Sequence, residues 1–350
     1  MEERRQKEDK PVTIYDIARE AGVSPSTVSR VLTNKVKVNQ EKRDIICKIM
    51  EKYDFKPNAL ARSLADTKSN TIGIITADIR NPFYAQIFVA CEMAARRAGY
   101  TVMLCNSLGE TEQEEQLLAR LQEQRVDAII QLGGRGDDLV SNPAYVEMVN
   151  RLIKTTPLIV SGKLDGTDVY QVQIDAVKAM ESIMEYLIRL KHTKIAMIGG
   201  RMDVLSTYQK RQTYLKVLEK HKIKPVQAFM RDNGEYSYEA GYQSMNELLS
   251  GTEIPTAVIA INDFSATGII RSIIEHGYRI PQDISVVSYD NTYMASFLIP
   301  KLTSVDYNYE AFGEKLVQTA ISASKKENLP KLQYIEPTLV IRESSGIAPI

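Results

Sequence analysis

Two short stretches near the N-terminus carry apolar residues at helical spacing. The first has them about one helical turn apart, at Ile14, Ile17, Ala18 and Ala21. Thr13 precedes this stretch and Asp16 follows three residues later, a spacing typical of a helix N-terminus. Gly22 suits the left-handed turn that ends a helix, and Ser24 followed by Pro25 suits the start of the next one. The pattern predicts two helices joined by a tight turn.

The second predicted helix has a polar face of short side chains and one arginine, formed by Ser26, Thr27, Ser29 and Arg30. Small hydroxyl side chains let a helix approach base edges in the major groove of DNA, and Arg30 can form two hydrogen bonds with a guanine. Lysine and arginine outnumber acidic residues in segment 10–68, although the whole chain contains 44 of each kind. This surplus favours contact with a polyanion. We interpret the segment as a helix-turn-helix; the alternative is a helical hairpin with an ordinary polar surface.

A third helical pattern covers residues 39–53 and is expected to pack on the first two helices through Ile45, Ile46, Ile49 and Met50. After Pro57, residues 58–65 can form one or two helical turns, which is too little to be stable alone. Such a helix would form against a partner, and Leu64 at its tip is a candidate for insertion into the minor groove. The alternative is a linker helix packed on the rest of the chain.

From residue 71 onward, short β-branched runs alternate with amphipathic helices. The candidate strands cover residues 71–76, 101–105, 128–132, 158–161, 194–198, 257–261 and 284–288. Strands that alternate with helices predict parallel sheets covered on both faces. This number of strands fits two α/β lobes better than one, and a break near residues 161–168 is expected.

Polar residues follow several of the predicted strands, namely Asp78, Asn81, Arg201, Asn262, Asp263, Asp290 and Asn291. Open parallel sheets bind ligands beyond the carboxyl ends of their strands. Carboxylates and amides there can bind vicinal hydroxyls, which suits a polyhydroxylated ligand. The chain has 18 tyrosines and no tryptophan, so stacking on such a ligand would fall to Tyr84, Tyr236, Tyr307 and Tyr309. For each single Asp or Asn, the alternative is a local role as the cap of the next helix.

The sequence offers no pattern for catalysis. It lacks the glycine motifs of dinucleotide and P-loop sites, a nucleophile elbow and an H-E-x-x-H motif. Three scattered cysteines and three histidines follow no metal-ligand spacing. We therefore expect no catalytic residue, no metal and no cofactor. No apolar run approaches the length of a membrane span, and the charged N-terminus is unlike a secretory signal. The expected location is the cytoplasm.

Three motifs together resemble the lactose-repressor and galactose-repressor family of bacterial transcription regulators. They are VTIYDIAREAGVSPSTVSRVL, KPNALARSL and TIGIITADIRNPFYAQI. The resemblance implies a regulator, expected to be a repressor, that binds a palindromic operator in double-stranded DNA as a homodimer. It also implies that helix 58–65 is a hinge helix whose Leu64 enters the minor groove. The residues expected to contact DNA are Thr13, Ser24, Ser26, Thr27, Ser29, Arg30, Asn34, Asn58, Ala61 and Leu64.

The resemblance further implies a core like that of periplasmic sugar-binding proteins, with an effector between two subdomains. Motif matches place family positions on Arg211, on the pairs Asn262–Asp263 and Tyr289–Asp290, and on Lys163. Departures occur at IDAVKAM, at Lys191–His192 and after Arg211. The residues expected to bind the effector are Asp78, Asn81, Tyr84, Lys163, Arg211, Tyr236, Asn262, Asp263, Asp290, Tyr307 and Tyr309. A carbohydrate is the expected effector. The alternatives are a nucleobase or nucleoside effector, or a free-standing sugar-binding protein.

The predicted organisation is therefore multidomain. An all-α helix-turn-helix domain covers residues 1–57, and a hinge helix and linker cover residues 58–70. The rest is an α/β core of two doubly wound parallel-sheet subdomains. The N-terminal subdomain is expected to cover residues 71–162 and 292–322, and the C-terminal subdomain residues 163–291 and 323–345.

Overall fold

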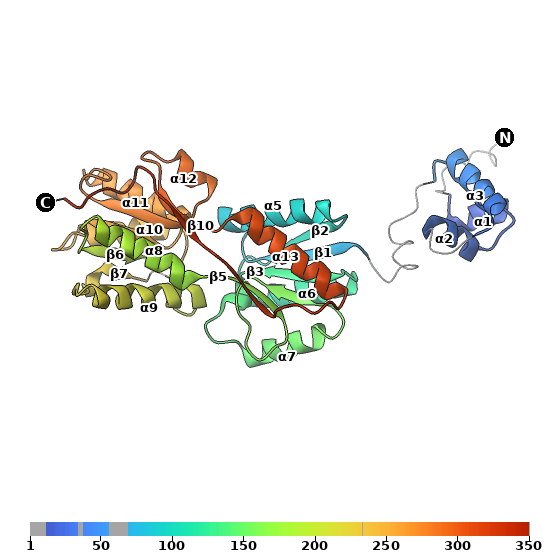
Figure 1. Cartoon of the computed structure of the whole chain (residues 1–350), viewed down its shortest axis with the longest axis horizontal. Coiled ribbons are helices and arrows are strands. Elements are labelled where there is room, and N and C mark those ends of the chain that lie inside the picture. The colour runs from blue at the N-terminus through green and yellow to red at the C-terminus, as the bar shows by residue number, and fades with distance from the viewer. Residues whose placement is uncertain (1–11, 34–37, 56–68, 233, 350) are drawn as a thin grey trace, which may run out of the picture. The chain divides into compact units, whose positions relative to one another are not determined.

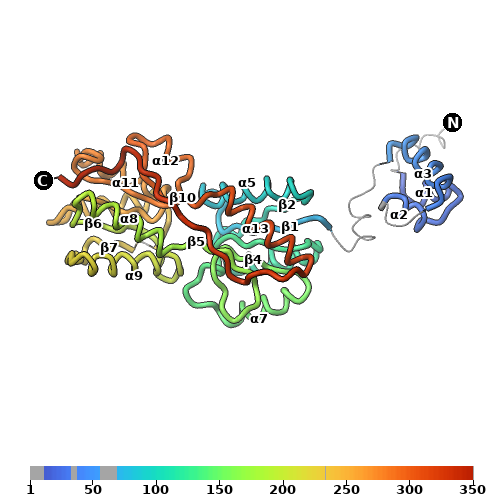
Figure 2. Tube along the Cα trace, in the orientation of Figure 1, coloured from blue at the N-terminus to red at the C-terminus, as the bar shows by residue number. Residues whose placement is uncertain are grey.

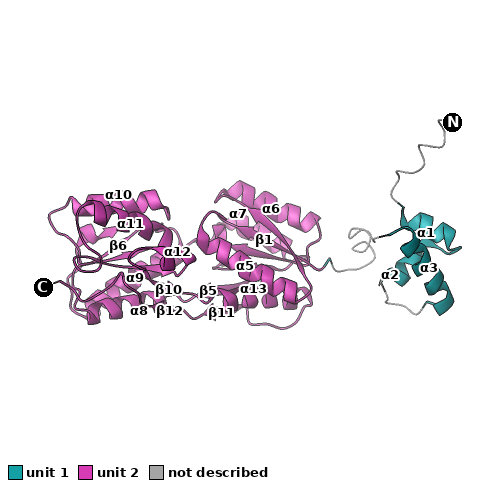
Figure 3. Cartoon of the chain, turned by 90° about the horizontal axis from the view of Figure 1, so that it is seen from above, with its two compact units in different colours: residues 1–69 teal, residues 70–350 magenta. Residues whose placement is uncertain are grey.

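The computed structural model describes residues 12–33, 38–55, 69–232 and 234–349. The chain forms two compact units, residues 1–69 and residues 70–350, which we call the head and the core (Figure 3). The boundary between them lies within the predicted linker 58–70. Among the described residues, no helix combines the length and the hydropathy required to span a bilayer.

The described part of the head is helical, with α1 (Ile14–Glu20), α2 (Pro25–Thr33) and α3 (Gln40–Lys52). The hydroxyl and the backbone N–H of Thr13 both donate to the carboxylate of Asp16, as expected for a capped helix start. Gly22 has φ +65° in the turn before α2. The head core contains Ile17, Ala18, Val28, Val31, Ile46 and Ile49, all of them buried. Ile45, predicted to pack there, is instead 44% exposed, because its neighbour Ile46 takes the inward position on α3.

The first half of the core is a six-stranded sheet that we call, with its helices, the N-lobe. Its strands are β1 (Thr71–Thr76), β2 (Thr101–Asn106), β3 (Ala128–Leu132), β4 (Leu158–Val160), β5 (Tyr170–Ile174) and β11 (Leu332–Ile335). They lie in the order β11-β5-β4-β3-β1-β2, and every neighbouring pair is parallel. One face packs on α5 (Pro82–Arg97) and α13 (Tyr309–Ser324), and the other on α6 (Thr111–Glu123) and α7 (Pro143–Leu152) (Figure 1).

The C-lobe contains a second sheet of the same size, in the order β12-β10-β9-β8-β6-β7. Its strands are β6 (Ile195–Ile198), β7 (Met230–Arg231), β8 (Ala257–Ala260), β9 (Ser285–Asp290), β10 (Thr303–Asp306) and β12 (Thr338–Val340). The last of these pairs antiparallel to β10. One face packs on α8 (Ala176–Arg189) and α9 (Leu205–Lys220), and the other on α10 (Tyr238–Leu249) and α11 (Asp263–Glu275). The short helix α12 (Tyr293–Phe297) follows β9.

The chain passes between the lobes after β5, after β10 and again after β11 (Figure 2). The predicted subdomain boundaries are wrong at these passages. Segment 163–291 was assigned to the C-terminal subdomain, but β5 pairs with β4 in the N-lobe. Segment 292–322 was assigned to the N-terminal subdomain, but β10 pairs with β9 in the C-lobe. Segment 323–345 contains β11, which belongs to the N-lobe sheet. These strands are short and lie at or near sheet edges, so their sequences lack the continuous apolar run of a central strand.

Candidate functional site

A cavity of about 880 Å³ lies between the N-lobe and the C-lobe. Its walls come from loops at the carboxyl ends of strands in both sheets, where open parallel sheets bind ligands. The volume suits a small organic molecule. Predicted effector residues that line it are Asp78, Asn81, Tyr84, Tyr236, Asn262, Asp290 and Tyr307.

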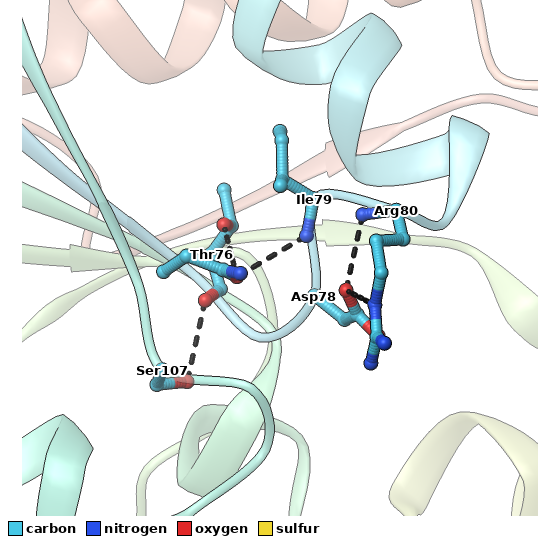
Figure 4. A network of polar contacts seen from close by, with 6 residues as sticks. Thr76, Asp78, Ile79, Arg80 and Ser107 are labelled. Atoms are coloured by element: carbon cyan, nitrogen blue, oxygen red, sulfur yellow. Dashed lines mark hydrogen bonds and ion pairs between the residues drawn. The ribbon is translucent and has the colours of Figure 1, made fainter.

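The loop after β1 is held by hydrogen bonds from neighbouring chain segments (Figure 4). The N–H of Ile79 donates to Oδ1 of Asn106, 3.2 Å away, and Nη2 of Arg80 donates to the Asp78 carboxylate over 2.8 Å. The Arg80 guanidinium holds the pKa of Asp78 below its usual range. Oδ1 of Asn81 accepts from the N–H of Phe83 at the start of α5. Asn81 thus caps a helix and also lines the cavity, and Asp78 reaches the cavity with its charge already paired.

The Asn262–Asp263 pair divides between two roles. Asn262 lines the cavity, and its Oδ1 accepts from the N–H of Ser265 while its Nδ2 donates to the carbonyl of Tyr236. Asp263 is fully buried and lies outside the cavity lining, contrary to the prediction. Its carboxylate accepts hydrogen bonds from the Ser288 and Ser304 hydroxyls and from the backbone N–H and hydroxyl of Thr292. With four donors on it, Asp263 fixes the loop after β9 and has no capacity left for a ligand.

Arg211, expected from the sequence to bind the effector, lies outside the cavity lining, and its guanidinium pairs with Asp232. The preceding residue, Lys210, lines the cavity and is buried. Successive residues of a helix point about 100° apart, so a shift of one position on α9 exchanges a cavity residue for an outward one.

Lys163 and Tyr309 also lie outside the cavity lining. Nζ of Lys163 pairs with the Asp165 carboxylate, 2.6 Å away. The hydroxyl of Tyr309 donates to the backbone carbonyl of Asp290 over 2.7 Å. Asp290 has φ +97°, a strained conformation for a residue with a side chain. The hydrogen bond from Tyr309 therefore stabilises the backbone of a cavity residue without contacting the cavity itself.

Lys210 and Asp290 are both buried in the cavity wall, close enough for their charges to interact. Burial raises the pKa of Asp290 and lowers that of Lys210, and each charge opposes the shift of the other. Nζ of Lys210 lies 3.8 Å from the centroid of the Tyr289 ring, which adds a cation–π contact. A ligand with hydroxyl groups can donate to the carboxylate and accept from the ammonium.

Two residues that line the cavity were not predicted, although the sequence contains a signal for each. Lys210 lies on the buried face of α9 with Thr207, Tyr214 and Val217. Glu114 lies on the buried face of α6 with Leu117, Leu118 and Leu121. A charged residue at an apolar position of a helical stripe is a sign of a site that needs it. Among the described residues, no group of three His, Cys, Asp or Glu side chains is placed to hold a metal ion.

The lobes contact each other beside the cavity. The N–H of Leu139 in the N-lobe donates to the carbonyl of Asp203 in the C-lobe over 2.7 Å, and Asp138 and Val204 form an antiparallel bridge. Away from this bridge, the N–H of Tyr293 donates to Oε1 of Gln86, 3.3 Å away. Both contacts join the N-lobe to the C-lobe.

The head presents the predicted DNA-reading face on α2. The hydroxyl of Ser24 accepts from the N–H of Thr27 at the helix start. Ser26 and Arg30 are exposed, and Thr27 and Ser29 are half-buried. Thr13 is exposed, although its hydroxyl is bonded to Asp16. The other predicted DNA contacts, Asn34, Asn58, Ala61 and Leu64, lie outside the described residues.

Two known families match this chain over separate segments. Residues 13–58 match the family described as bacterial regulatory proteins, lacI family, and residues 184–345 match the periplasmic binding protein-like domain. The chain is 32% identical over 322 residues to catabolite control protein A of Staphylococcus epidermidis, covering 91% of this chain and 94% of that protein. It is 29% identical over 341 residues to the HTH-type transcriptional repressor PurR of Mannheimia succiniciproducens, covering 95% and 98%.

A solved structure resembles nearly the whole fold. The lac repressor dimer bound to operator and the anti-inducer ONPF matches with a TM-score of 0.85 and 28% sequence identity. The match covers 96% of this chain and 100% of that one. Both the head and the two-lobed core therefore have counterparts in one known molecule.

Proposed function

The chain belongs to the lacI family of bacterial regulatory proteins and is a DNA-binding transcription regulator, and from this premise we propose that a carbohydrate in the interlobe cavity controls its affinity for a palindromic operator. The protein is not an enzyme, since the relatives it matches over most of its length are regulators. The attached head also argues against a free-standing sugar-binding protein. The observation that carries the proposal is a ligand-sized cavity between two lobes on a chain that begins with a helix-turn-helix.

The lobe contacts supply a mechanism for this control. An effector in the cavity favours one angle between the lobes, because it contacts walls from both of them. A different angle breaks or re-forms the bridge at Leu139 and Asp203 and the contact between Gln86 and Tyr293. The N-lobe connects directly to segment 58–70, so in a dimer the angle sets the spacing of the two segments that meet DNA. The effector thereby changes the free energy required to order segment 58–70 on the operator, and this change couples effector binding to DNA binding.

The chemistry of the cavity supports a carbohydrate. Carboxylate and amide groups from Asp290 and Asn262 can bind vicinal hydroxyls, and the rings of Tyr84, Tyr236 and Tyr307 can cover the apolar face of a sugar. Of these, Asn262 has part of its hydrogen-bonding capacity used by the protein, which fixes its orientation. A rigid polar wall with aromatic rings is what a small polyhydroxylated ligand requires.

The head is proposed to read one operator half-site through α2. We expect a selection from random duplexes with the full chain to return a palindrome. We also expect Arg30→Ala to reduce discrimination at one base pair of each half-site by about 5- to 150-fold, the range for a lost bidentate arginine–guanine contact. Binding to unrelated DNA should change much less. The measurement is fluorescence anisotropy with the selected and base-substituted duplexes at fixed salt. Recovery of no palindrome, or equal losses on all duplexes, would contradict this role.

A second copy of the chain is the proposed occupant of an apolar surface that crosses both lobes. Its exposed residues are Val89, Met93, Leu104, Tyr293, Phe297 and Ile299, of which the last two are 76% and 87% exposed. They lie on or near α5, β2 and α12, which share one side of the core (Figure 1). Exposed apolar surface of this extent marks an interaction site. A palindromic operator requires two heads related by a two-fold axis, which favours a second copy as the partner.

Ile299→Glu is therefore expected to weaken the dimer at least tenfold and operator binding with it, because a buried unpaired carboxylate is costly in an interface. Sedimentation equilibrium measures the dimer directly. Leu332→Glu is the matched control, since Leu332 is also exposed but lies on β11, at the opposite edge of the N-lobe sheet from β2. An Ile299→Glu protein that sediments as the wild type would place the interface elsewhere.

A further inference from the structure

Glu114 carries a buried carboxylate oxygen without a hydrogen bond in the wall of the effector cavity. It is 2% exposed and lines the cavity from α6. Its Oε2 accepts from the N–H of Arg135 at 3.2 Å, and its Oε1 is buried and has no hydrogen-bond partner among the described residues. The Tyr145 hydroxyl, which donates to Gln131 at 2.9 Å, lies near this carboxyl group and lowers its pKa. The turn that begins at Gly133 lies directly on this carboxylate, because a Cβ at Gly134 would come within 1.9 Å of Oε2. The carboxylate is thus held rigidly, with one oxygen left over.

A second carboxylate stands beside it on the same wall. Asp137 lines the cavity at the end of the short 3-10 helix Gly134–Asp137, and no described residue donates a hydrogen bond to its side chain. Burial, with the charges of Asp138 and Glu114, raises the pKa of Asp137 to about 7. Burial likewise raises the pKa of Glu114. Neither carboxyl group has a positively charged partner strong enough to offset the effect of burial on its pKa.

The basic side chains of the cavity wall are engaged elsewhere. Among the described residues, Arg80 pairs with Asp78, Arg135 with Glu115 and Arg201 with Asp203, while Lys210 faces Asp290. The Arg135 guanidinium lowers the pKa of Glu114 less than burial raises it. The N-lobe wall therefore contains two carboxyl groups that have no ion-pair partner among the described basic side chains.

The choice of ligand follows from these carboxyl groups. The hydroxyls of a neutral sugar can donate to them but supply no positive charge, and a buried carboxylate without a positive partner is costly. An ammonium group donates three hydrogen bonds and also cancels a charge. Resting on the function proposed above, we propose that the effector is an amino sugar whose ammonium group binds Glu114 and Asp137. Its ring then lies among the tyrosines of the cavity, whose faces also favour a cation.

Matched ligands test the assignment by isothermal titration calorimetry on the full chain. The probes are glucosamine, galactosamine and mannosamine, each with its neutral parent hexose and its N-acetyl derivative, together with adenine, guanine and hypoxanthine. We expect at least one amino sugar to bind ten or more times tighter than both its parent and its N-acetyl form. Glu114→Gln keeps the shape and removes the charge, so it should reduce that ratio at least tenfold.

Glu112→Gln is the control variant, because Glu112 lies two residues away on the same helix, is exposed and does not line the cavity. It should leave the ratio unchanged. Tighter binding of a neutral hexose or a nucleobase, or binding of no probe at all, would overturn the amino-sugar assignment. An amino-sugar preference that Glu114→Gln does not change would overturn the role of these carboxylates. Failure of the proposed function is a separate result: a ligand that binds the cavity without changing operator affinity.

Discussion

Replacing Lys210 with methionine is expected to move the effector response to about 30-fold higher effector concentration, while Arg211→Met leaves it unchanged. Lys210 lines the cavity beside Asp290, and Arg211 pairs with Asp232 outside the cavity lining. Loss of one charge-assisted contact to the ligand costs about 2 kcal/mol, which corresponds to a 30-fold loss of effector affinity. Operator affinity without effector should stay within a few-fold of the wild type, because the head is unchanged. Fluorescence anisotropy with the selected operator, titrated with effector, measures both quantities.

A second variant separates this ligand contact from a loss of stability. Lys210→Met leaves Asp290 buried without its opposite charge, and removing one partner of a buried pair destabilises a protein. The double variant Lys210→Met with Asp290→Asn removes both charges, so it should regain thermal stability and keep the weakened effector response. A normal response in Lys210→Met, or its loss in Arg211→Met, would mean that the effector contacts α9 in a different way.

Asp263→Ala is expected to give the largest loss of stability of any single change at this end of the C-lobe. The substitution removes the acceptor for hydrogen bonds from Ser288, Ser304 and Thr292. These donors are buried, and each unsatisfied buried donor costs about 1–3 kcal/mol. We expect the free energy of unfolding to fall by about 4 kcal/mol and the melting temperature by about 10 °C.

Thermal unfolding can be followed by circular dichroism or by tyrosine fluorescence, since the chain has no tryptophan. Asp165→Ala is the matched control: it removes an aspartate whose carboxylate pairs with Lys163 and is largely exposed. That protein should melt almost as the wild type does. A melting temperature of Asp263→Ala equal to that of the control would show that the Asp263 hydrogen bonds contribute little to stability.

The sequence predicted the parts of the site that follow strands. Asp78, Asn262 and Asp290 each come after a buried β-branched run, and the parallel-sheet rule brings such residues to one edge. Site residues on helices were harder to predict, because a motif match that is off by one residue selects a side chain that points about 100° away. That is how Arg211 was chosen where Lys210 lines the cavity. Glu114 was missed because the strand rule does not search helices.

The lobe boundaries failed for a different physical reason. Strand β5 reads YQVQI, with only Val172 buried along it, and β12 has three residues. Such strands carry little apolar pattern of their own, since their pairing depends on neighbours that are far away in the sequence. The points at which the chain crosses between the lobes are therefore defined only by the order of the strands in the two sheets.

The central claim is that the cavity and the DNA-binding head are coupled, and linkage gives its most direct measurement. The affinity of the full chain for its selected operator is measured with and without saturating effector, and the affinity for effector is measured with and without saturating operator. The account predicts that both ratios differ from one and are equal, because coupling between two binding sites is reciprocal. An effector that binds the cavity with the same affinity whether or not operator is present would contradict it.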